Sequence, residues 1–156
     1  FLLNRSFVYL QNKSSLTKTK KLMEIKFNEN DGGRIDYFPS QKKKDVAGDC
    51  VFRSIAITTG LDYMEVWNKL FELGTKIGQL PNDQKTYTKF LNGMGIKKLP
   101  TLKDINGKKY RLHSFPLNKG KYIIHTTNHL TTVIDGVVND SWDCRNWCCN
   151  SYYKID

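Results

Sequence analysis

A cysteine stands at the boundary between a polar loop and an apolar stretch, in the segment AGDCVFRSIAITTG at 47–60. The apolar residues that follow Cys50 recur with helical spacing, so we expect a helix that begins at Cys50 with Asp49 as its N-cap. A thiol in the first turn of a helix lies at the positive end of the helix dipole, which favours the thiolate. Cys50 is therefore either a reactive nucleophile or a small side chain that packs in the core.

A base that takes up a proton and returns it is the second group that thiol chemistry requires. The segment HLTTVIDG opens with His129, and an imidazole has a pKa suited to this role near neutral pH. His125 and His113 are alternatives, but neither is followed by a turn and an acidic return strand. We therefore expect His129 to be the partner of Cys50; the other interpretation is a surface or hydrogen-bonded histidine.

An acidic residue on the strand that follows His129 can orient the imidazole and stabilise its charged form. The pair Asp135-Gly136 predicts a two-residue hairpin turn. In that register Thr131 opposes Asp140, and the side chains of His129 and Asp140 share one face of the sheet. A three-residue loop would shift the register and bring Asp143 to that face instead. The sequence favours Asp140 as the third member of a triad, with Asp143 as the alternative.

Helices are expected in the first half of the chain, beginning with the one that carries the cysteine and stops at Gly60. The next lies in LDYMEVWNKLFELG, where Asp62 and Glu65 form a capping-box pair ahead of an apolar stripe. We expect this helix to end at Gly74. A third helix is expected roughly over 84–92.

The second half of the chain changes to the short β-branched and aromatic runs typical of strands. We therefore expect an α+β domain in which N-terminal helices pack on a C-terminal antiparallel sheet. The segment 24–38 is expected to form a short hairpin or an extended arm. The expected strands lie at 108–115, 121–128, 129–136, 137–143 and 151–155.

Composition and charge narrow the function classes. The chain has 156 residues, of which 39% are apolar and 26% charged, as in a folded domain. No stretch approaches the roughly 20 apolar residues of a membrane span, so we expect no membrane contact. The net charge is +10, but residues 1–22 carry five basic residues and no acid. Short basic runs such as 42–44 are typical of solvated loops, so we do not expect nucleic acid as a partner.

Residues 1–22 form a basic extension ahead of one domain over 23–156. Their acid-free, hydroxyl-rich composition is typical of a targeting segment. It equally suits an arm that docks on the domain itself or on a protein assembly. The cysteine pattern favours the cytoplasm or another reducing compartment, with a virion or an organelle as alternatives.

The segment DCRNWCCNSYY holds the other three cysteines, Cys144, Cys148 and Cys149. Adjacent cysteines rarely bond to each other, and this spacing is not that of a usual zinc site. We expect packed or spectator thiols and neither a metal nor another cofactor; zinc binding or a disulfide with a partner are the alternatives. Trp142 is expected on the face of the predicted His–Asp pair, where it either shields the pair from water or packs in the core.

Two motifs carry a resemblance to a known family. They are GDCVFRSIAITTG, with an arginine three residues after the cysteine, and HLTTVIDGVVNDSWD. In these motifs the chain resembles a family of small, mostly uncharacterised bacterial and phage proteins that is similar to papain-like thiol hydrolases. The resemblance covers about residues 45–145 and implies a papain-like α+β fold without implying a substrate. It also implies Cys50 as nucleophile, His129 as base and Asp140 or Asp143 as the orienting acid.

The chain departs from the papain-like pattern at the oxyanion donor. Papain-like enzymes usually place a glutamine six residues before the cysteine, where this chain has Lys44. The nearest glutamine is Gln41, nine residues before. We expect the oxyanion to be bound by Gln41, or by the backbone N–H of Cys50 together with another donor.

The expected function is that of a cysteine-dependent hydrolase or acyltransferase acting on an amide or isopeptide bond of a peptide or protein. Its triad would be Cys50, His129 and Asp140. The alternative is a catalytically silent binding or structural subunit with the same fold, anchored to a larger assembly through residues 1–22.

Overall fold

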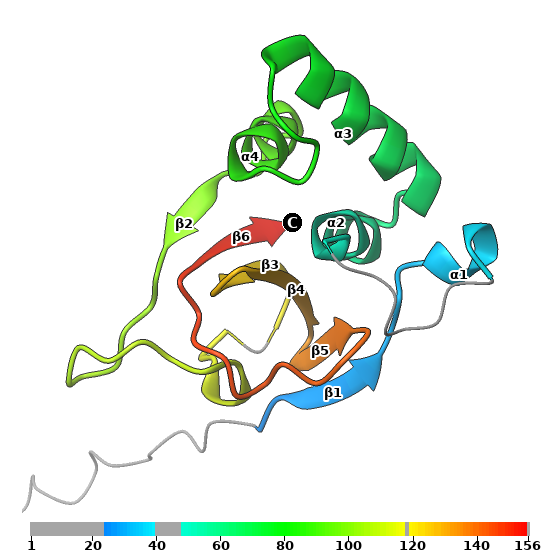
Figure 1. The fold of residues 1–156 in the computed structure, drawn as a ribbon. Coiled ribbons are helices and arrows are strands. Elements are labelled where there is room, and N and C mark those ends of the chain that lie inside the picture. Colours follow the sequence, from blue (N-terminus) through cyan, green and yellow to red (C-terminus); the bar gives the residue numbers. More distant parts are fainter. Residues whose placement is uncertain (1–23, 40–47, 118, 156) are drawn as a thin grey trace, which may run out of the picture.

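The computed structural model describes residues 24–39, 48–117 and 119–155. A six-stranded sheet forms the centre of the molecule, and the longer helices cover one of its faces (Figure 1). The strand order in the sheet is β1-β5-β4-β3-β6-β2. The strands are Lys26–Glu29 (β1), Lys98–Pro100 (β2), Lys121–Thr126 (β3), His129–Ile134 (β4), Val137–Asp140 (β5) and Ser151–Ile155 (β6).

The helices precede most of the sheet in the chain, as the sequence predicts for an α+β protein. They are Arg34–Tyr37 (α1), Cys50–Thr59 (α2), Tyr63–Ile77 (α3) and Gln84–Gly93 (α4). α2 lies directly against β4 and β3, and α3 packs on both α2 and α4. None of the described helices combines the length and the apolar character that a bilayer crossing requires.

Side chains from both faces of the sheet are buried. On β3, Ile123 belongs to the core cluster that α2, α3 and α4 cover, together with Leu130 of β4. Tyr122 and Ile124 alternate with Ile123 and belong to a second cluster on the other face, where Leu112 and Phe115 of the segment before β3 cover them. The sheet is therefore held in place on both sides, which fixes the positions of the residues at its strand ends.

The β4–β5 hairpin has the predicted register. Ile134 pairs with Val137 and Thr132 pairs with Asn139 across the turn. Asp135 and Gly136 adopt positive φ angles of 47° and 77°, as a type I′ turn requires. The hairpin thus brings the beginning of β4 and the end of β5 to the same edge of the sheet.

The prediction of a wholly antiparallel sheet is wrong at one edge. β1 pairs in parallel with β5, and the amide of Lys26 donates to the carbonyl of Gly136. The segment 24–38 is thus neither a hairpin nor an arm but a strand followed by α1. Its pairing joins residues more than a hundred positions apart, which local alternation does not encode.

The strand expected at 108–115 is also wrong. Leu112–Ser114 forms a 3-10 turn, and Arg111 forms only an isolated bridge with Cys148. Leu112 and Phe115 are both buried against the second face of the sheet. A single turn of helix brings both of these side chains to the same face, whereas a strand would point residues at odd separations to opposite faces.

The helix expected to end at Gly74 continues to Ile77, and Gly78 at φ 67° ends it. Gly74 is needed for another reason, because a Cβ at this position would lie 2.7 Å from the carbonyl oxygen of Gln79. The chain leaving α3 passes close over the helix backbone here, and only glycine leaves room for it.

Candidate active site

Cys50 is the first residue of α2, with Asp49 at the N-cap, as the sequence predicts. Its side chain is half-buried. It lies at the wall of a cleft of about 300 Å³, which His129 also lines. A thiol from the head of a helix and an imidazole from the beginning of a strand therefore line the same cleft.

Asp49 does not cap α2 with its carboxylate, in contrast to Asp62 and Asp83 at the starts of α3 and α4. Its Oδ2 lies 3.1 Å from Nε of Arg34, and its Oδ1 pairs with Nη1 of Arg53. Because the carboxylate is turned away, the N–H groups in the first turn of α2 are left uncapped by it. These groups and the helix dipole make the surroundings of Cys50 favourable to negative charge.

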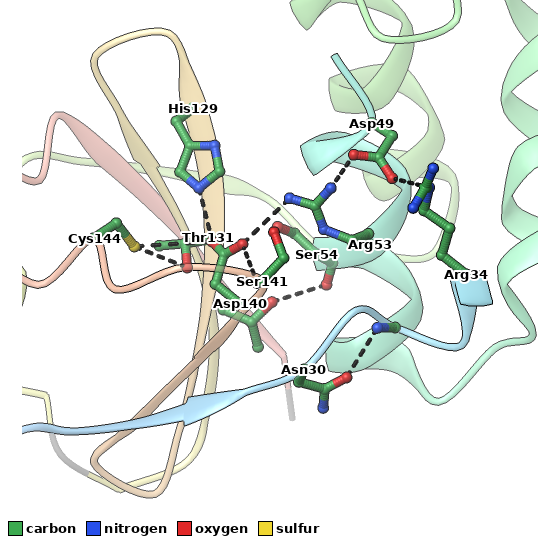
Figure 2. Close-up of polar contacts among 12 residues, drawn as sticks. Asn30, Arg34, Asp49, Arg53, Ser54, His129, Thr131, Asp140, Ser141 and Cys144 are labelled. Carbon is green, nitrogen blue, oxygen red and sulfur yellow. Dashed lines mark hydrogen bonds and ion pairs between the residues drawn. The ribbon is translucent and has the colours of Figure 1, made fainter. Parts of the chain in front are cut away.

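His129 begins β4 and is held by Asp140 at the end of β5. Its Nε2 lies 2.7 Å from Oδ2 of Asp140, and both side chains are buried (Figure 2). Since Nε2 is occupied by the carboxylate, Nδ1 is the ring nitrogen left to face the cleft. Burial alone would lower the pKa of His129, but polar interactions with Asp140, Cys144 and Cys50 raise it to about 11. The imidazole is therefore positively charged at neutral pH.

Asp140 accepts hydrogen bonds from several directions. Besides His129, Nη2 of Arg53 lies 3.3 Å from its Oδ1, and the amide of Ser141 donates to the same oxygen at 2.7 Å. Burial by itself would raise the pKa of Asp140, but His129, the hydroxyl of Thr131 and the charge of Arg53 together hold it below its usual value. The carboxylate therefore remains ionised and keeps the imidazole protonated and oriented.

A buried chain of charges thus runs from α1 through α2 to the hairpin. It consists of Arg34, Asp49, Arg53, Asp140 and His129, in which positive and negative groups alternate (Figure 2). Arg53 is the arginine of the first motif, and sequence reasoning alone gives it no role. Its spacing of four residues from Asp49 is the available signal, since this places both side chains on one side of a helix.

The cleft around Cys50 has polar, uncharged side chains at its rim. Asn82, Gln84 and Asn128 line it together with His125. Burial, with a smaller contribution from the charge of Lys98, lowers the pKa of His125, so this second histidine is neutral where His129 is charged. His125 thus reaches the same cleft but lacks the acidic partner that His129 has among the described residues.

The structure separates the two candidate acids. Asp143 is exposed and forms a bidentate pair with Arg145 at 2.9 Å, whereas Asp140 contacts the imidazole. Trp142 packs beside the ring of His129 with 5.0 Å between centroids, and Trp147 lies 6.2 Å away. Both indoles are exposed to solvent and contact the imidazole ring.

Two further predictions concern the oxyanion donor and the cysteines. Gln41, the candidate oxyanion donor, lies outside the described residues. The four cysteines are all described and all free, with Cys144 and Cys149 buried. Cys144 lies 3.4 Å from the hydroxyl of Thr131 and 3.8 Å from Oδ2 of Asp140, so it packs beneath the His–Asp pair.

His129, Asp140 and Cys144 form a group whose potential ligand atoms lie within 4.8 Å of one another. Two ligand atoms of a tetrahedral zinc ion lie about 3.3 Å apart, given bonds of about 2 Å. The 2.7 Å contact between Nε2 and Oδ2 is a direct hydrogen bond, too short to enclose an ion. Arg53 also places a positive charge on the same carboxylate. The group therefore fits an ion pair better than a metal centre.

Comparison of the chain with known protein families, curated proteins and solved structures finds no match. The chemistry of the site is therefore inferred from the geometry of its own residues.

Proposed function

We propose that this chain is a cysteine-dependent hydrolase or acyltransferase with a papain-like fold, which acts on an amide or isopeptide bond of a peptide or protein. The observation that carries the proposal is that Cys50 and His129 line one cleft while Asp140 holds the far nitrogen of the imidazole at 2.7 Å. Thiol acyl transfer depends on this spatial arrangement, in which a base lies beside the nucleophile and an acid orients the base.

In the first half-reaction the thiolate of Cys50 attacks the carbonyl carbon, and the carbonyl electron pair moves onto oxygen. The imidazolium of His129 then gives its proton to the leaving nitrogen, the C–N bond breaks and an acyl-thioester is left on Cys50. Asp140 stabilises the charged imidazole in the resting enzyme, which supports a thiolate–imidazolium pair.

In the second half-reaction, water or an amine attacks the thioester while the now neutral His129 removes its proton. The C–S bond breaks and the thiolate is restored. Water as acceptor makes the protein a hydrolase, and an amine makes it an acyltransferase. The uncharged rim of the cleft, with Asn82, Gln84 and Asn128, suits the hydrogen-bonding groups of a peptide backbone.

The test is alkylation by iodoacetamide, with each cysteine peptide quantified by mass spectrometry across a pH series. A free thiol is less than about 1% ionised at pH 6, so fast alkylation of Cys50 there requires the ion pair. His129→Ala should abolish this reactivity near pH 6. His125→Ala is the matched control, since it removes an imidazole from the same cleft that has no carboxylate partner, and it should leave the rate unchanged.

Two results would contradict the proposal. One is equal reactivity of all the accessible cysteines, and the other is alkylation of Cys50 that does not depend on His129. Either result would favour a binding subunit that keeps the fold without the chemistry.

A further inference from the structure

Tyr87 is a buried residue of the cleft whose hydroxyl the triad does not use. It lies on α4, and only 3% of its surface is exposed. It nevertheless lines the same cleft as Cys50. Its ring is fixed by the core, where it packs edge-on against Tyr153 with 6.4 Å between centroids. Packing in the core therefore holds the phenol of Tyr87 in one position.

The hydroxyl of Tyr87 makes no hydrogen bond within the described part of the chain. Its neighbour Tyr153 differs, because the hydroxyl of Tyr153 bonds to Oγ1 of Thr88 at 2.8 Å. Among the described side chains, Nε of Arg53 and Oγ of Ser151 are the enclosed polar atoms that lack a partner. The Tyr87 hydroxyl is not one of these, which fits a group that opens onto the cleft. A buried polar side chain usually has a partner, so a free one at a reaction centre calls for a ligand.

The surroundings of the Tyr87 hydroxyl keep it protonated, so that it can donate a hydrogen bond. Burial raises the pKa of Tyr87, and electrostatic interactions with its neighbours, including Tyr153 and Asp83, add to the effect. Tyr87 and Cys50 line the same cleft, so a carbonyl group bound at the sulfur would also meet the wall that Tyr87 forms. Since the pKa is raised, Tyr87 keeps its proton throughout the pH range in which a thiol hydrolase works.

We propose that the Tyr87 hydroxyl is the side-chain donor of the oxyanion hole, acting with the backbone N–H of Cys50. This inference rests on the proposed function and supplies the group that the papain-like pattern assigns to a glutamine. When the Sγ–C bond forms, negative charge develops on the former carbonyl oxygen, and Tyr87 donates a hydrogen bond to it. The charge returns to the carbonyl when the leaving group departs, and the phenolic proton never leaves its oxygen.

Two other polar residues of the cleft, Asn82 and Gln84, are poorer candidates. Asn82 is exposed, and its Nδ2 already donates to the carbonyl of Gly48 at 3.3 Å. Gln84 is exposed at the first position of α4, so ordering its long side chain would cost conformational entropy in the transition state. Tyr87 is held in advance by the core, and such preorganisation is what makes an oxyanion donor effective.

The test compares two reactions of Cys50 that differ in their need for an oxyanion hole. Alkylation by iodoacetamide displaces iodide at a saturated carbon and creates no oxyanion. Acylation by p-nitrophenyl acetate passes through a tetrahedral intermediate with a charged oxygen, and its rate is followed by p-nitrophenolate release. Cys50→Ser gives the background of both reactions.

In the full chain, Tyr87→Phe should slow acylation about a hundredfold and leave alkylation unchanged. Tyr153→Phe is the matched control, because it removes a buried phenolic hydroxyl from the adjacent ring without touching the cleft, and it should change neither rate. Acylation at the wild-type rate in Tyr87→Phe would overturn the assignment. An equal fall of both rates would also overturn it, because Tyr87 would then only support the position of Cys50.

This outcome is separable from failure of the proposed function. If alkylation of Cys50 does not depend on His129, the hydrolase itself is wrong. If that dependence holds and Tyr87→Phe acylates normally, only the role of Tyr87 is wrong.

Discussion

Arg53 lies between two carboxylates, with one guanidinium nitrogen on Asp49 and another 3.3 Å from Oδ1 of Asp140. Asp49 precedes Cys50 at the head of α2, and Asp140 binds the imidazole of His129 from the end of β5. One side chain therefore couples the two halves of the site, which otherwise come from opposite parts of the sequence. All of these groups are buried, so water does not screen their charges.

The first prediction concerns this coupling. Arg53→Met should lower the free energy of unfolding by about 3–5 kcal/mol, because it leaves two buried carboxylates without their shared partner. Arg53→Lys keeps the charge but cannot reach both carboxylates in a fork, so it should recover only part of the stability. Urea unfolding followed by circular dichroism measures both changes.

Lys69→Met is the control for Arg53, since Lys69 forms an exposed pair with Glu65 at the same spacing of four residues within a helix. It should change the free energy of unfolding by less than about 1 kcal/mol. A similar loss of stability in the two variants would mean that the buried ion pairs of Arg53 with Asp49 and Asp140 stabilise the fold no more than an exposed pair does. In the surviving folded fraction of Arg53→Lys, slower alkylation of Cys50 near neutral pH would show that Arg53 also positions the triad.

The second prediction separates the two candidate acids. Asp140→Asn should lower the pKa of His129 from about 11, because the imidazolium loses the carboxylate that stabilises it. Alkylation of Cys50 at about pH 6 should fall by about tenfold or more as the ion pair weakens. The imidazole is followed directly by NMR titration of its ring resonances.

Asp143→Asn is the matched control, because it neutralises a neighbouring, exposed carboxylate whose partner is Arg145 and not the imidazole. It should leave both the histidine titration and the alkylation rate unchanged. The opposite pattern, in which Asp143→Asn is the damaging change, would assign the orienting role to Asp143.

The third prediction concerns stability and pH. The folded-state pKa of His129 is raised from 6.5 to about 11, so its stabilising contribution is complete below pH 6.5 and is lost as the pH rises towards 11. The pKa of Asp140 is lowered from 3.8, so its contribution is present above pH 3.8 and is lost in acid. The difference in free energy of unfolding between the wild type and His129→Gln should therefore shrink steadily from neutral to alkaline pH.

His125→Gln should show the opposite slope. Burial lowers the pKa of His125, so protonation costs stability as the pH falls through 6.5. The advantage of the wild type over this variant should therefore increase with pH in that range. Urea unfolding of His129→Gln above pH 6.5 and of His125→Gln below it measures the two slopes. A wild-type advantage over His125→Gln that fell with rising pH below 6.5 would contradict a neutral His125.

Much of the site was predictable because its signals are local. Helical spacing and the N-cap Asp49 place Cys50 at the head of α2, and the Asp135-Gly136 turn alone sets the register that brings Asp140 beside His129. The parallel pairing of β1 and the role of Arg53 depend on contacts between residues far apart in the sequence, which no local pattern encodes. Tyr87 reads in the sequence as one more apolar residue of an amphipathic helix, and only the cleft distinguishes its hydroxyl.

The last prediction concerns Gly74. A glycine in a helical segment can mark either the end of the helix or a site where another part of the chain packs closely, and the sequence does not distinguish the two. In the interior of α3, Gly74→Ala would gain helix propensity, but its Cβ would lie 2.7 Å from the backbone oxygen of Gln79. We expect the clash to prevail and to lower the free energy of unfolding by about 1–3 kcal/mol. Gly93→Ala is the control, because a Cβ there meets nothing within 4 Å, and it should stabilise the protein by up to about 1 kcal/mol. Urea unfolding of the two variants gives shifts of opposite sign if Gly74 serves the passage of the chain over α3. Shifts of the same sign would mean that the α3–loop contact yields easily.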